Sequence, residues 1–314
     1  MKKYELARVM KPGILTTFQD MGRYGYQQFG IPVSGAMDTF AFQVANILVG
    51  NSRNEAAMEV TLIGPSIEAK ATITLAITGA DLSPTLNQKP APMWKSFSLK
   101  PGDVLSFGKR CSGMRAYIAV AGGFTITTYF GSKSTDQNSG LGMELEKNTI
   151  LYGVKTPRKD GVSIDKKLLP SYTNEVKVGV VEGPHTTTFS EQARNTFFTN
   201  TYTVGPNSNR MGYRLKSEQS VKPNEEGIWS DPVPFGGIQV PGNGEPIILM
   251  ADRQTTGGYP RLGTVMSSDL PKIAQLAPND TIHFYPISVT EAQKTARDTE
   301  AVLHKLETFY RGGT

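Results

Sequence analysis

The sequence has a single cysteine, Cys111, which excludes a disulfide framework and any zinc or iron–sulfur site built on several cysteines. Its three histidines, His185, His283 and His304, lie too far apart in sequence to indicate a metal cluster. We therefore expect no metal site. The net charge is only +5, and the basic residues are scattered rather than gathered in a stripe, so nucleic acid is not expected as a partner.

Long apolar runs are also lacking. The longest stretch without a formal charge covers residues 116–132 and contains several glycines, so we do not expect it to cross a membrane as a helix. The N-terminal residues include Lys2, Lys3, Glu5 and Arg8 but no apolar segment typical of a signal peptide. The sequence therefore predicts a cytoplasmic protein without a membrane partner.

Turn-forming residues are abundant. The 314 residues include 32 glycines and 20 prolines, and 38% of all residues are hydrophobic, which is enough to form a sizeable core. Frequent tight turns favour a mainly β fold, and the length favours two domains.

Short apolar runs bounded by turn residues predict the strands. In residues 72–78, isoleucine and leucine alternate with threonine and alanine, a pattern typical of a half-buried strand. Similar runs occupy residues 57–62, 104–107, 117–121, 175–181 and 247–250.

Few helices are predicted: residues 38–50, a short helix after Ser268 with Pro271 in its first turn, and residues 291–311. Asp38 has the side chain of an N-cap for the first of these. Thr290 and Gln293 are predicted to form a capping box for the last.

Two segments indicate how the chain is organised. Residues 155–174 are polar and lack an apolar period, which predicts a linker or a long surface excursion. Residues 99–107 and 276–284 share Leu, Pro, Asp and Phe at matching positions. This likeness leaves two interpretations open, an internal duplication or the chance similarity of two ordinary turns.

The standard nucleotide-binding and hydrolase motifs are absent. The segment Gly131-Ser-Lys-Ser-Thr135 resembles a phosphate-binding loop only superficially, because the upstream glycine of that motif is missing. A structural turn is the better interpretation.

The first candidate site is the polar segment 251–260, which follows the apolar strand 247–250. Arg253 offers a planar pair of donors for a carboxylate or phosphate. Thr255 and Thr256 add hydroxyl groups, and the glycine pair at 257–258 lets backbone N–H groups approach an anion. The alternative interpretation is a surface turn in which an aspartate and an arginine pair with each other.

The second candidate site contains Arg210 and Arg214. If this segment is a loop or a helical turn, the two guanidinium groups can converge on one anion. The alternative is a solvated basic turn. Lesser candidates are Asp20, Arg23 and the segment 34–38, whose Asp38 is first of all a helix cap.

Many stretches, in order along the chain, resemble one known family. They are residues 12–20, 22–25, 33–38, 45–51, 77–81, 117–123, 131–135, 210–215, 232–234, 238–241 and 251–260. This series resembles the KipA-like family, also called the 5-oxoprolinase C-subunit family or allophanate hydrolase subunit 2, within the biotin-dependent carboxyltransferase group. The sequence departs from the family pattern at Lys133, where we expect arginine, at Asn209, where an acidic residue is usual, and at Phe235, where proline is common.

The resemblance implies a mainly β fold with few helices, in which the C-terminal half forms a cyclophilin-like β-barrel. We accordingly expect a β-rich N-terminal domain at residues 1–160, a linker at 161–174, the barrel at 175–288 and a C-terminal helix at 289–314.

The resemblance also implies a function. We expect the C subunit of an ATP-dependent 5-oxoprolinase, which opens 5-oxoproline to L-glutamate together with a KipI-like B subunit and an A subunit. ATP is the expected cofactor of the complex, at a site that the sequence does not identify, and no covalent biotin is expected because no attachment site is visible. The alternatives are a carboxyltransferase component that acts on a urea-like or amide substrate, and a non-catalytic antagonist of a KipI-like kinase inhibitor.

Combining the two candidate segments with the resemblance gives a set of predicted site residues. The predicted catalytic residues are Asp252, Arg253 and Thr255. The predicted substrate-binding residues are Arg210, Tyr213, Arg214, Gln254, Thr256, Gly257 and Gly258. Arg253, helped by Arg210 or Arg214, is expected to bind a carboxylate or phosphoryl group.

Overall fold

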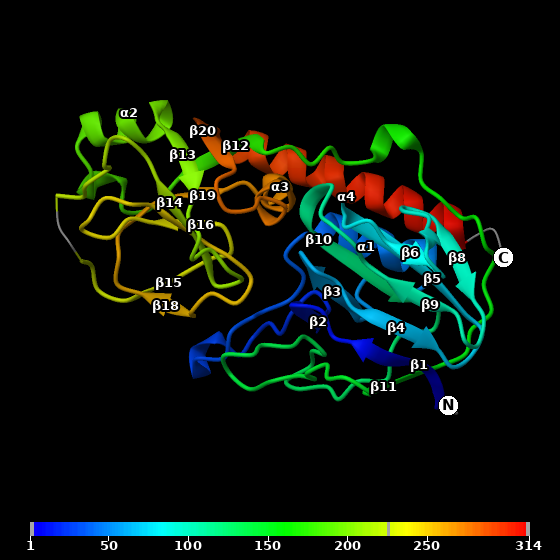
Figure 1. Ribbon diagram of the computed structural model, residues 1–314. Coiled ribbons are helices and arrows are strands. Elements are labelled where there is room, and N and C mark those ends of the chain that lie inside the picture. Colours follow the sequence, from blue (N-terminus) through cyan, green and yellow to red (C-terminus); the bar gives the residue numbers. More distant parts are fainter. Residues whose placement is uncertain (1–2, 225–226, 312–314) are drawn as a thin grey trace. The chain divides into compact units, whose positions relative to one another are not determined.

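The computed structural model describes residues 3–224 and 227–311 (Figure 1). The chain forms two compact units, each made of segments that are discontinuous in sequence. Unit 1 contains residues 1–23, 38–172 and 301–314, and unit 2 contains residues 24–37 and 173–300. This division differs from the expected continuous domains, because residues 24–37 belong with the barrel. Residues 1–2 of the expected N-terminal domain and residues 312–314 of the expected C-terminal helix lie outside the described residues.

Unit 1 is built from two β-sheets. The six-stranded sheet has the order β11 (Ile150–Gly153), β1 (Tyr4–Lys11), β4 (Ser66–Ala69), β9 (Val104–Ser106), β6 (Thr85–Leu86) and β7 (Lys89–Pro90). The five-stranded sheet has the order β2 (Leu15–Gln19), β3 (Ala57–Thr61), β10 (Ser112–Val120), β5 (Ile73–Asp81) and β8 (Ser96–Leu99). Both sheets contribute to one hydrophobic core, to which the first gives Leu6 and Ile67 and the second gives Phe18, Leu75 and Ile118.

Helix α1 (Thr39–Leu48) covers the other face of the five-stranded sheet. As predicted, Asp38 is its N-cap, and the Asp38 carboxylate accepts a hydrogen bond of 2.9 Å from the backbone N–H of Ala41. The helix explains why β5 differs from the half-buried strand that its sequence predicts. Thr78 is fully buried, and its hydroxyl donates to the backbone oxygen of Ala41 at 2.7 Å, so both faces of β5 are covered.

The first residues of the expected linker 161–174 belong to unit 1. The backbone N–H of Val162 donates to the Ser96 hydroxyl at 3.0 Å, and Gly161 N–H donates to the Ser96 carbonyl at 2.8 Å. Residues as far as Tyr172 belong to unit 1, and the chain enters unit 2 at Thr173.

Unit 2 is a closed seven-stranded barrel. Its strand order is β12 (Glu175–Glu182), β19 (Arg261–Val265), β16 (Gly237–Gln239), β17 (Ile247–Leu249), β14 (Gly212–Lys216), β13 (Thr201–Val204) and β20 (Thr281–Pro286). The barrel closes through the parallel pairing of β20 with β12. A separate two-stranded ribbon is formed by β15 (Asp231–Pro232) and β18 (Thr256–Gly257). The predicted mainly β fold with a C-terminal barrel is therefore confirmed.

The helices of unit 2 match the prediction only in part. The short helix α3 (Leu270–Ala274) has Pro271 in its first turn, as predicted. Helix α2 (Glu191–Thr199) was not predicted, although Ser190 caps it by accepting a 3.1 Å hydrogen bond from Ala193 N–H. Its sequence offers only one fully buried residue, Phe197, so the apolar period is weak. Short 3₁₀ helices occupy Gln27–Phe29, Lys166–Leu168, Thr186–Thr188 and Ser267–Asp269.

The C-terminal helix α4 (Val289–Arg311) begins two residues before the range 291–311 that the local pattern predicts, and at the residue where the expected C-terminal segment 289–314 begins. Its capping box is Ser288 with Glu291, not Thr290 with Gln293. The Glu291 carboxylate accepts from Ser288 N–H at 3.1 Å, and the Ser288 hydroxyl accepts from Glu291 N–H at 3.2 Å. A glutamate fits this motif better than the glutamine because its charge also favours the helix N-terminus.

The two similar turns share their local structure only. The Asp103 carboxylate accepts from Lys100 N–H at 2.7 Å, and the Asp280 carboxylate accepts from Ala277 N–H at the same distance. The strands that follow belong to different architectures, since β9 lies in an open antiparallel sheet and β20 closes the barrel in parallel with β12.

Candidate functional site in the barrel unit

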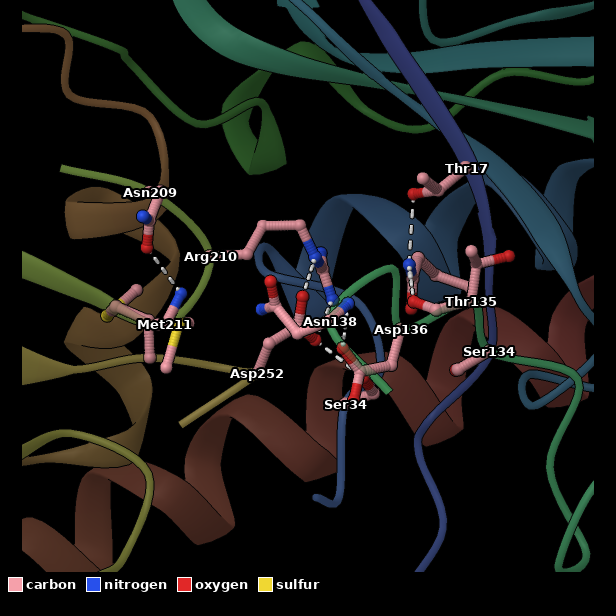
Figure 2. A network of polar contacts seen from close by, with 12 residues as sticks. Thr17, Ser34, Ser134, Thr135, Asp136, Asn138, Asn209, Arg210, Met211 and Asp252 are labelled. Atoms are coloured by element: carbon pink, nitrogen blue, oxygen red, sulfur yellow. Dashed lines mark hydrogen bonds and ion pairs between the residues drawn. The ribbon is translucent and has the colours of Figure 1, made fainter. Parts of the chain in front are cut away.

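A buried ion pair joins the two predicted site segments of unit 2 (Figure 2). The Arg210 guanidinium donates to both carboxylate oxygens of Asp252, from Nε to Oδ2 at 2.7 Å and from Nη2 to Oδ1 at 2.8 Å. Both side chains are more than nine-tenths buried. This bidentate geometry is the strongest form of an arginine–carboxylate pair. Asp252 therefore pairs with Arg210, and the alternative interpretation, a surface pair of Asp252 with its neighbour Arg253, is wrong.

Ser34 is the third member of this network. Its hydroxyl donates to Asp252 Oδ1 at 2.5 Å, and Arg210 Nη2 also donates to the backbone oxygen of Gly35 at 2.7 Å. The φ angle of Ser34 is 57°, in the left-handed region that non-glycine residues rarely adopt. Such conformations persist where surrounding contacts hold them and often occur at functional sites. Here the network fixes the segment 24–37 to the barrel.

Arg253 directly follows Asp252 in sequence and is also buried. Its Nε donates to the Val233 carbonyl at 3.0 Å, and its guanidinium lies 5.6 Å from the ring centre of Phe235. Within residues 3–224 and 227–311, no carboxylate lies within ion-pair distance of it. Burial lowers the pKa of Arg253, while nearby Tyr24 and Asp252 raise it. A buried cation of this kind favours binding an anion.

Two side-chain amides meet at Gly257. A Cβ atom placed on Gly257 would lie 2.5 Å from Gln239 Nε2 and 2.8 Å from Gln254 Nε2. Glycine is therefore required there for space, since no positive φ is involved. Gln239 is buried on strand β16, and Gln254 is exposed. The two amides are hydrogen-bond donors that can polarise a carbonyl group.

The remaining residues of segment 251–260 have backbone roles or are exposed. Gly257 and Thr256 pair with Asp231 and Pro232 in the two-stranded ribbon, so Gly257 lies in a paired strand. The Thr255 carbonyl accepts from Val233 N–H at 3.1 Å. The Gly258 carbonyl accepts from Ile228 N–H at 2.9 Å.

Tyr213 and Arg214, two of the predicted substrate-binding residues, lie on opposite sides of strand β14. Residues 212–216 form strand β14 rather than a loop or helical turn, so alternate side chains point to opposite sides. Tyr213 is 1% exposed in the barrel core, and its hydroxyl donates to the Leu276 carbonyl at 3.3 Å. Arg214 is exposed, whereas Arg210 is buried against Asp252. The predicted convergence of Arg210 and Arg214 on one anion is therefore wrong.

Sequence reasoning missed Gln239 as a site residue. The sequence does contain a signal for it, since the glutamine stands between isoleucine and valine in the apolar run 238–240. A polar side chain at a buried strand position needs a hydrogen-bond partner, which marks it as a candidate site residue.

Unit 1 contains a second polar cluster, centred on Asp20. The Asp20 carboxylate accepts hydrogen bonds of 2.7 Å from the Ser132 hydroxyl, the Ser134 hydroxyl and the Lys133 N–H. Lys133 Nζ donates to the Glu55 carboxylate at 2.5 Å. The Ser132 and Ser134 hydroxyls and both donors of Lys133 are thus already bound to carboxylates. This arrangement favours the structural-turn interpretation.

Neither a metal cluster nor a membrane span is found in the part of the chain that the structure describes. Within those residues, no group of three or more His, Cys, Asp or Glu side chains is arranged to hold a metal ion. Among the described helices, none has the length and apolar character needed to cross a membrane.

Comparisons with known proteins identify relatives over nearly the whole chain. The model of the carboxyltransferase domain, subdomain A and B, matches residues 29–286. The C subunit of 5-oxoprolinase from Escherichia coli is 34% identical over 307 residues, which cover 96% of this chain and 97% of that protein. The C subunit of 5-oxoprolinase from Haemophilus influenzae is 33% identical, with 92% and 94% coverage.

Longer proteins contain a similar region. The urea amidolyase of Saccharomyces cerevisiae is 33% identical over 94% of this chain, which spans only 17% of that protein. Among solved structures, the K. lactis urea amidolyase has a TM-score of 0.90 and 31% identity, covering 98% of this chain and 20% of that one.

Proposed function

Because the chain belongs to the carboxyltransferase-domain family that includes the C subunit of 5-oxoprolinase, we propose that it is the C subunit of such an enzyme. The observation that carries this proposal is the coverage in both directions, 96% of this chain and 97% of the Escherichia coli protein. A region embedded in a larger enzyme would leave most of its relative unmatched, as the match to urea amidolyase does. The reaction is the opening of 5-oxoproline to L-glutamate, in a complex with a KipI-like B subunit and an A subunit.

The geometry of unit 2 fits the substrate. 5-Oxoproline carries one carboxylate and one lactam carbonyl. The buried Arg253 guanidinium, which lacks an acidic partner among the described residues, is suited to the carboxylate. The amides of Gln239 and Gln254 at Gly257 are suited to the carbonyl oxygen, whose negative charge increases when a nucleophile attacks the lactam carbonyl carbon, before the C–N bond breaks.

Asp252 and Arg210 then have a supporting role. Both carboxylate oxygens of Asp252 are engaged by Arg210, and one also accepts from Ser34, so the group is poorly placed to act as a base. Its effect on the reaction is to hold the backbone next to Arg253 in place. A catalytic role for Thr255 remains a prediction, since only its backbone contact is defined.

ATP is proposed to bind elsewhere in the complex. Asp20 already occupies the Ser132 and Ser134 hydroxyls and the Lys133 N–H, and Glu55 binds Lys133 Nζ. A phosphate group would have to displace two carboxylates to use this segment. Equilibrium dialysis of the chain alone with labelled ATP is expected to show no saturable binding, and saturable binding would contradict this assignment.

The experiment that tests the function uses the chain co-purified with the A and B subunits from the same organism. Glutamate formation from 5-oxoproline is followed with and without ATP, omitting each of the three proteins in turn. We expect ATP-dependent glutamate that disappears when this chain is left out. A stable complex that forms no glutamate would overturn the proposal and would favour a regulatory role as antagonist of a KipI-like inhibitor.

Arg253→Met tests the assignment of the site within that complex. Hydrogen bonds to charged groups contribute about 1.5–3 kcal/mol, so kcat/KM should fall by roughly 10- to 100-fold. Arg297→Met, on an exposed position of α4, is the control for loss of positive charge. Activity of Arg253→Met within about twofold of wild type would remove Arg253 from the site.

A second candidate function is carboxyl transfer to a urea-like substrate. The observation that favours it is the TM-score of 0.90 to K. lactis urea amidolyase over 98% of this chain. In that case the chain would need a separate biotin carboxylase and biotin carrier. Bicarbonate-dependent carboxylation of urea by such a mixture, without glutamate formation in the first assay, would support this alternative.

A further inference from the structure

Unit 1 contains a cavity that the proposed function does not use. Its volume is about 330 Å³, and it lies between Lys3, strand β2, strand β11 and residues 124–129. Its apolar wall includes Phe18, Phe124, Ile126, Met143, Leu151 and Tyr152. Phe18 and Phe124 pack edge to face with ring centres 5.1 Å apart. The volume is at the lower end of the range for small-molecule sites.

One cation, Lys3, also lines this cavity. Lys3 Nζ lies over the Tyr152 ring, 4.1 Å from its centre. No carboxylate in the part of the chain that the structure describes lies within ion-pair distance of Lys3. An ammonium group held over an aromatic ring beside an apolar wall leaves its charge available to an anion.

Thr135, which follows the Asp20 cluster in sequence, supports residues on one side of the cavity. Thr135 N–H donates to the Phe18 carbonyl at 2.8 Å, and the Thr135 hydroxyl donates to the Met143 carbonyl at 3.2 Å. Gly142 packs so closely that an added Cβ would lie 2.5 Å from Thr135 Cα. The segment 131–135, which is tied to Asp20, therefore positions Met143 and Gly142 on one side of the cavity. This gives the phosphate-loop-like segment a role that its sequence did not indicate.

We propose that this cavity binds a small organic monocarboxylate with an apolar body, of the size of benzoate. The apolar wall receives the body of the ligand, and Lys3 receives its carboxylate. The aromatic and aliphatic side chains favour a ligand with an apolar body over a fully polar one, although Thr125, Thr127 and Tyr129 also line the cavity. The small volume excludes nucleotides and other large ligands. This binding site is independent of the proposed function.

The test is ligand titration of the full chain by isothermal calorimetry or ligand-observed NMR. The probes are benzoate, the uncharged isostere benzamide, and acetate, which has the charge without the apolar body. Benzoate should bind saturably with a Kd on the order of 1 mM or below. Benzamide and acetate should each bind at least about fivefold more weakly, because each lacks one of the two recognised parts.

Two matched pairs of variants locate the site. Thr127 lines the cavity and is exposed, so Thr127→Trp fills the opening at little risk to folding, and Thr128→Trp is the control on the adjacent exposed residue. Lys3→Gln removes the cation. Lys155→Gln is its control, because Lys155 likewise lies over a tyrosine ring, 4.8 Å from the centre of Tyr4, but does not line the cavity.

Thr127→Trp should abolish benzoate binding, and Lys3→Gln should weaken it about fivefold or more, while both controls bind as wild type does. The proposal is overturned if benzoate shows no saturable binding up to about 10 mM. It is also overturned if benzamide binds as tightly as benzoate, or if Thr127→Trp leaves the affinity unchanged.

Discussion

Replacing Asp252 by asparagine should strongly destabilise unit 2. Asparagine keeps the shape of the side chain but has only one acceptor oxygen, and its NH₂ group then faces the donors of Arg210. The Arg210 charge, 7% exposed, loses the carboxylate that binds it in a bidentate pair. Removing one member of a buried ion pair typically costs 3–5 kcal/mol. Because Gly35 still accepts from Arg210, we expect a loss at the lower end, about 3 kcal/mol.

Urea unfolding measures the free energy of unfolding of the variant. Amide hydrogen exchange, measured on peptides that cover β14 and β17, then shows where the structure opens. These strands belong to the barrel, so their exchange reports on unit 2 rather than on unit 1. The matched control is Asp231→Asn in the same unit. It breaks the Arg261–Asp231 pair, which is longer at 3.4 Å and has a carboxylate side chain that is 39% exposed. Such pairs contribute less than about 1 kcal/mol.

If Asp252→Asn lowers the free energy of unfolding by less than about 1 kcal/mol, the reasoning is refuted. The buried charge of Arg210 would then not need this carboxylate for its stabilisation. The double variant Arg210→Met/Asp252→Leu provides a further check. Replacing both charges with apolar groups of similar volume should restore most of the stability. If the double variant is as unstable as the single one, packing rather than uncompensated charge determines the loss.

Three further changes have defined outcomes. Gly257→Ala should lower kcat of the assembled complex by more than about tenfold, because the new Cβ displaces the Gln239 and Gln254 amides. The control Gly227→Ala should leave kcat unchanged, because its Cβ meets only the Gly258 carbonyl, at 3.6 Å. Ser288→Ala should destabilise the chain by about 1 kcal/mol in urea, and Thr290→Ala by clearly less, because Ser288 is the cap of α4. Burial raises the pKa of Tyr202, so above about pH 10 the unfolded chain releases this proton and the folded chain retains it. Stability should therefore fall by up to about 1.4 kcal/mol per pH unit there, and Tyr202→Phe should have a flatter profile. Equal slopes for the two proteins would contradict this.

The local elements of the fold were largely predictable because their signals are local. Asp38 caps α1 and Pro271 lies in the first turn of α3, as the sequence indicates. The errors arose where tertiary contacts override the local pattern. Thr78 of β5 looks like a solvent-facing residue, but α1 covers it. The start of α4 was misplaced because two overlapping cap motifs are available, and only the glutamate of Ser288–Glu291 carries the charge that the helix N-terminus favours.

The sequence predicts which segments form the candidate site, but not which of their side chains lie together. Segment 251–260 was selected for its polar residues after an apolar strand, and the structure places Arg253 there, buried and without an acidic partner among the described residues. The structure separates Tyr213 from Arg214 because two residues that are adjacent in a strand point to opposite sides. A pattern read as a loop or helical turn assigns both to one site, whereas a strand buries Tyr213 and exposes Arg214.

The network around Asp252 illustrates what a single sequence cannot provide. Ser34 and Asp252 are 218 residues apart, and the contact exists only because residues 24–37 leave unit 1 and pack with the barrel. Neither residue carries a local signal for the other, since Ser-Gly before a helix is typical of an ordinary turn. The left-handed backbone of Ser34 is held by contacts of this segment with Asp252 and Arg210. Relaxation of Ser34 in the Asp252→Asn variant should therefore appear as faster amide exchange in residues 24–37, before any change in β14 or β17. If these residues exchange as in wild type while the barrel is destabilised, the network stabilises the barrel alone and does not hold the segment.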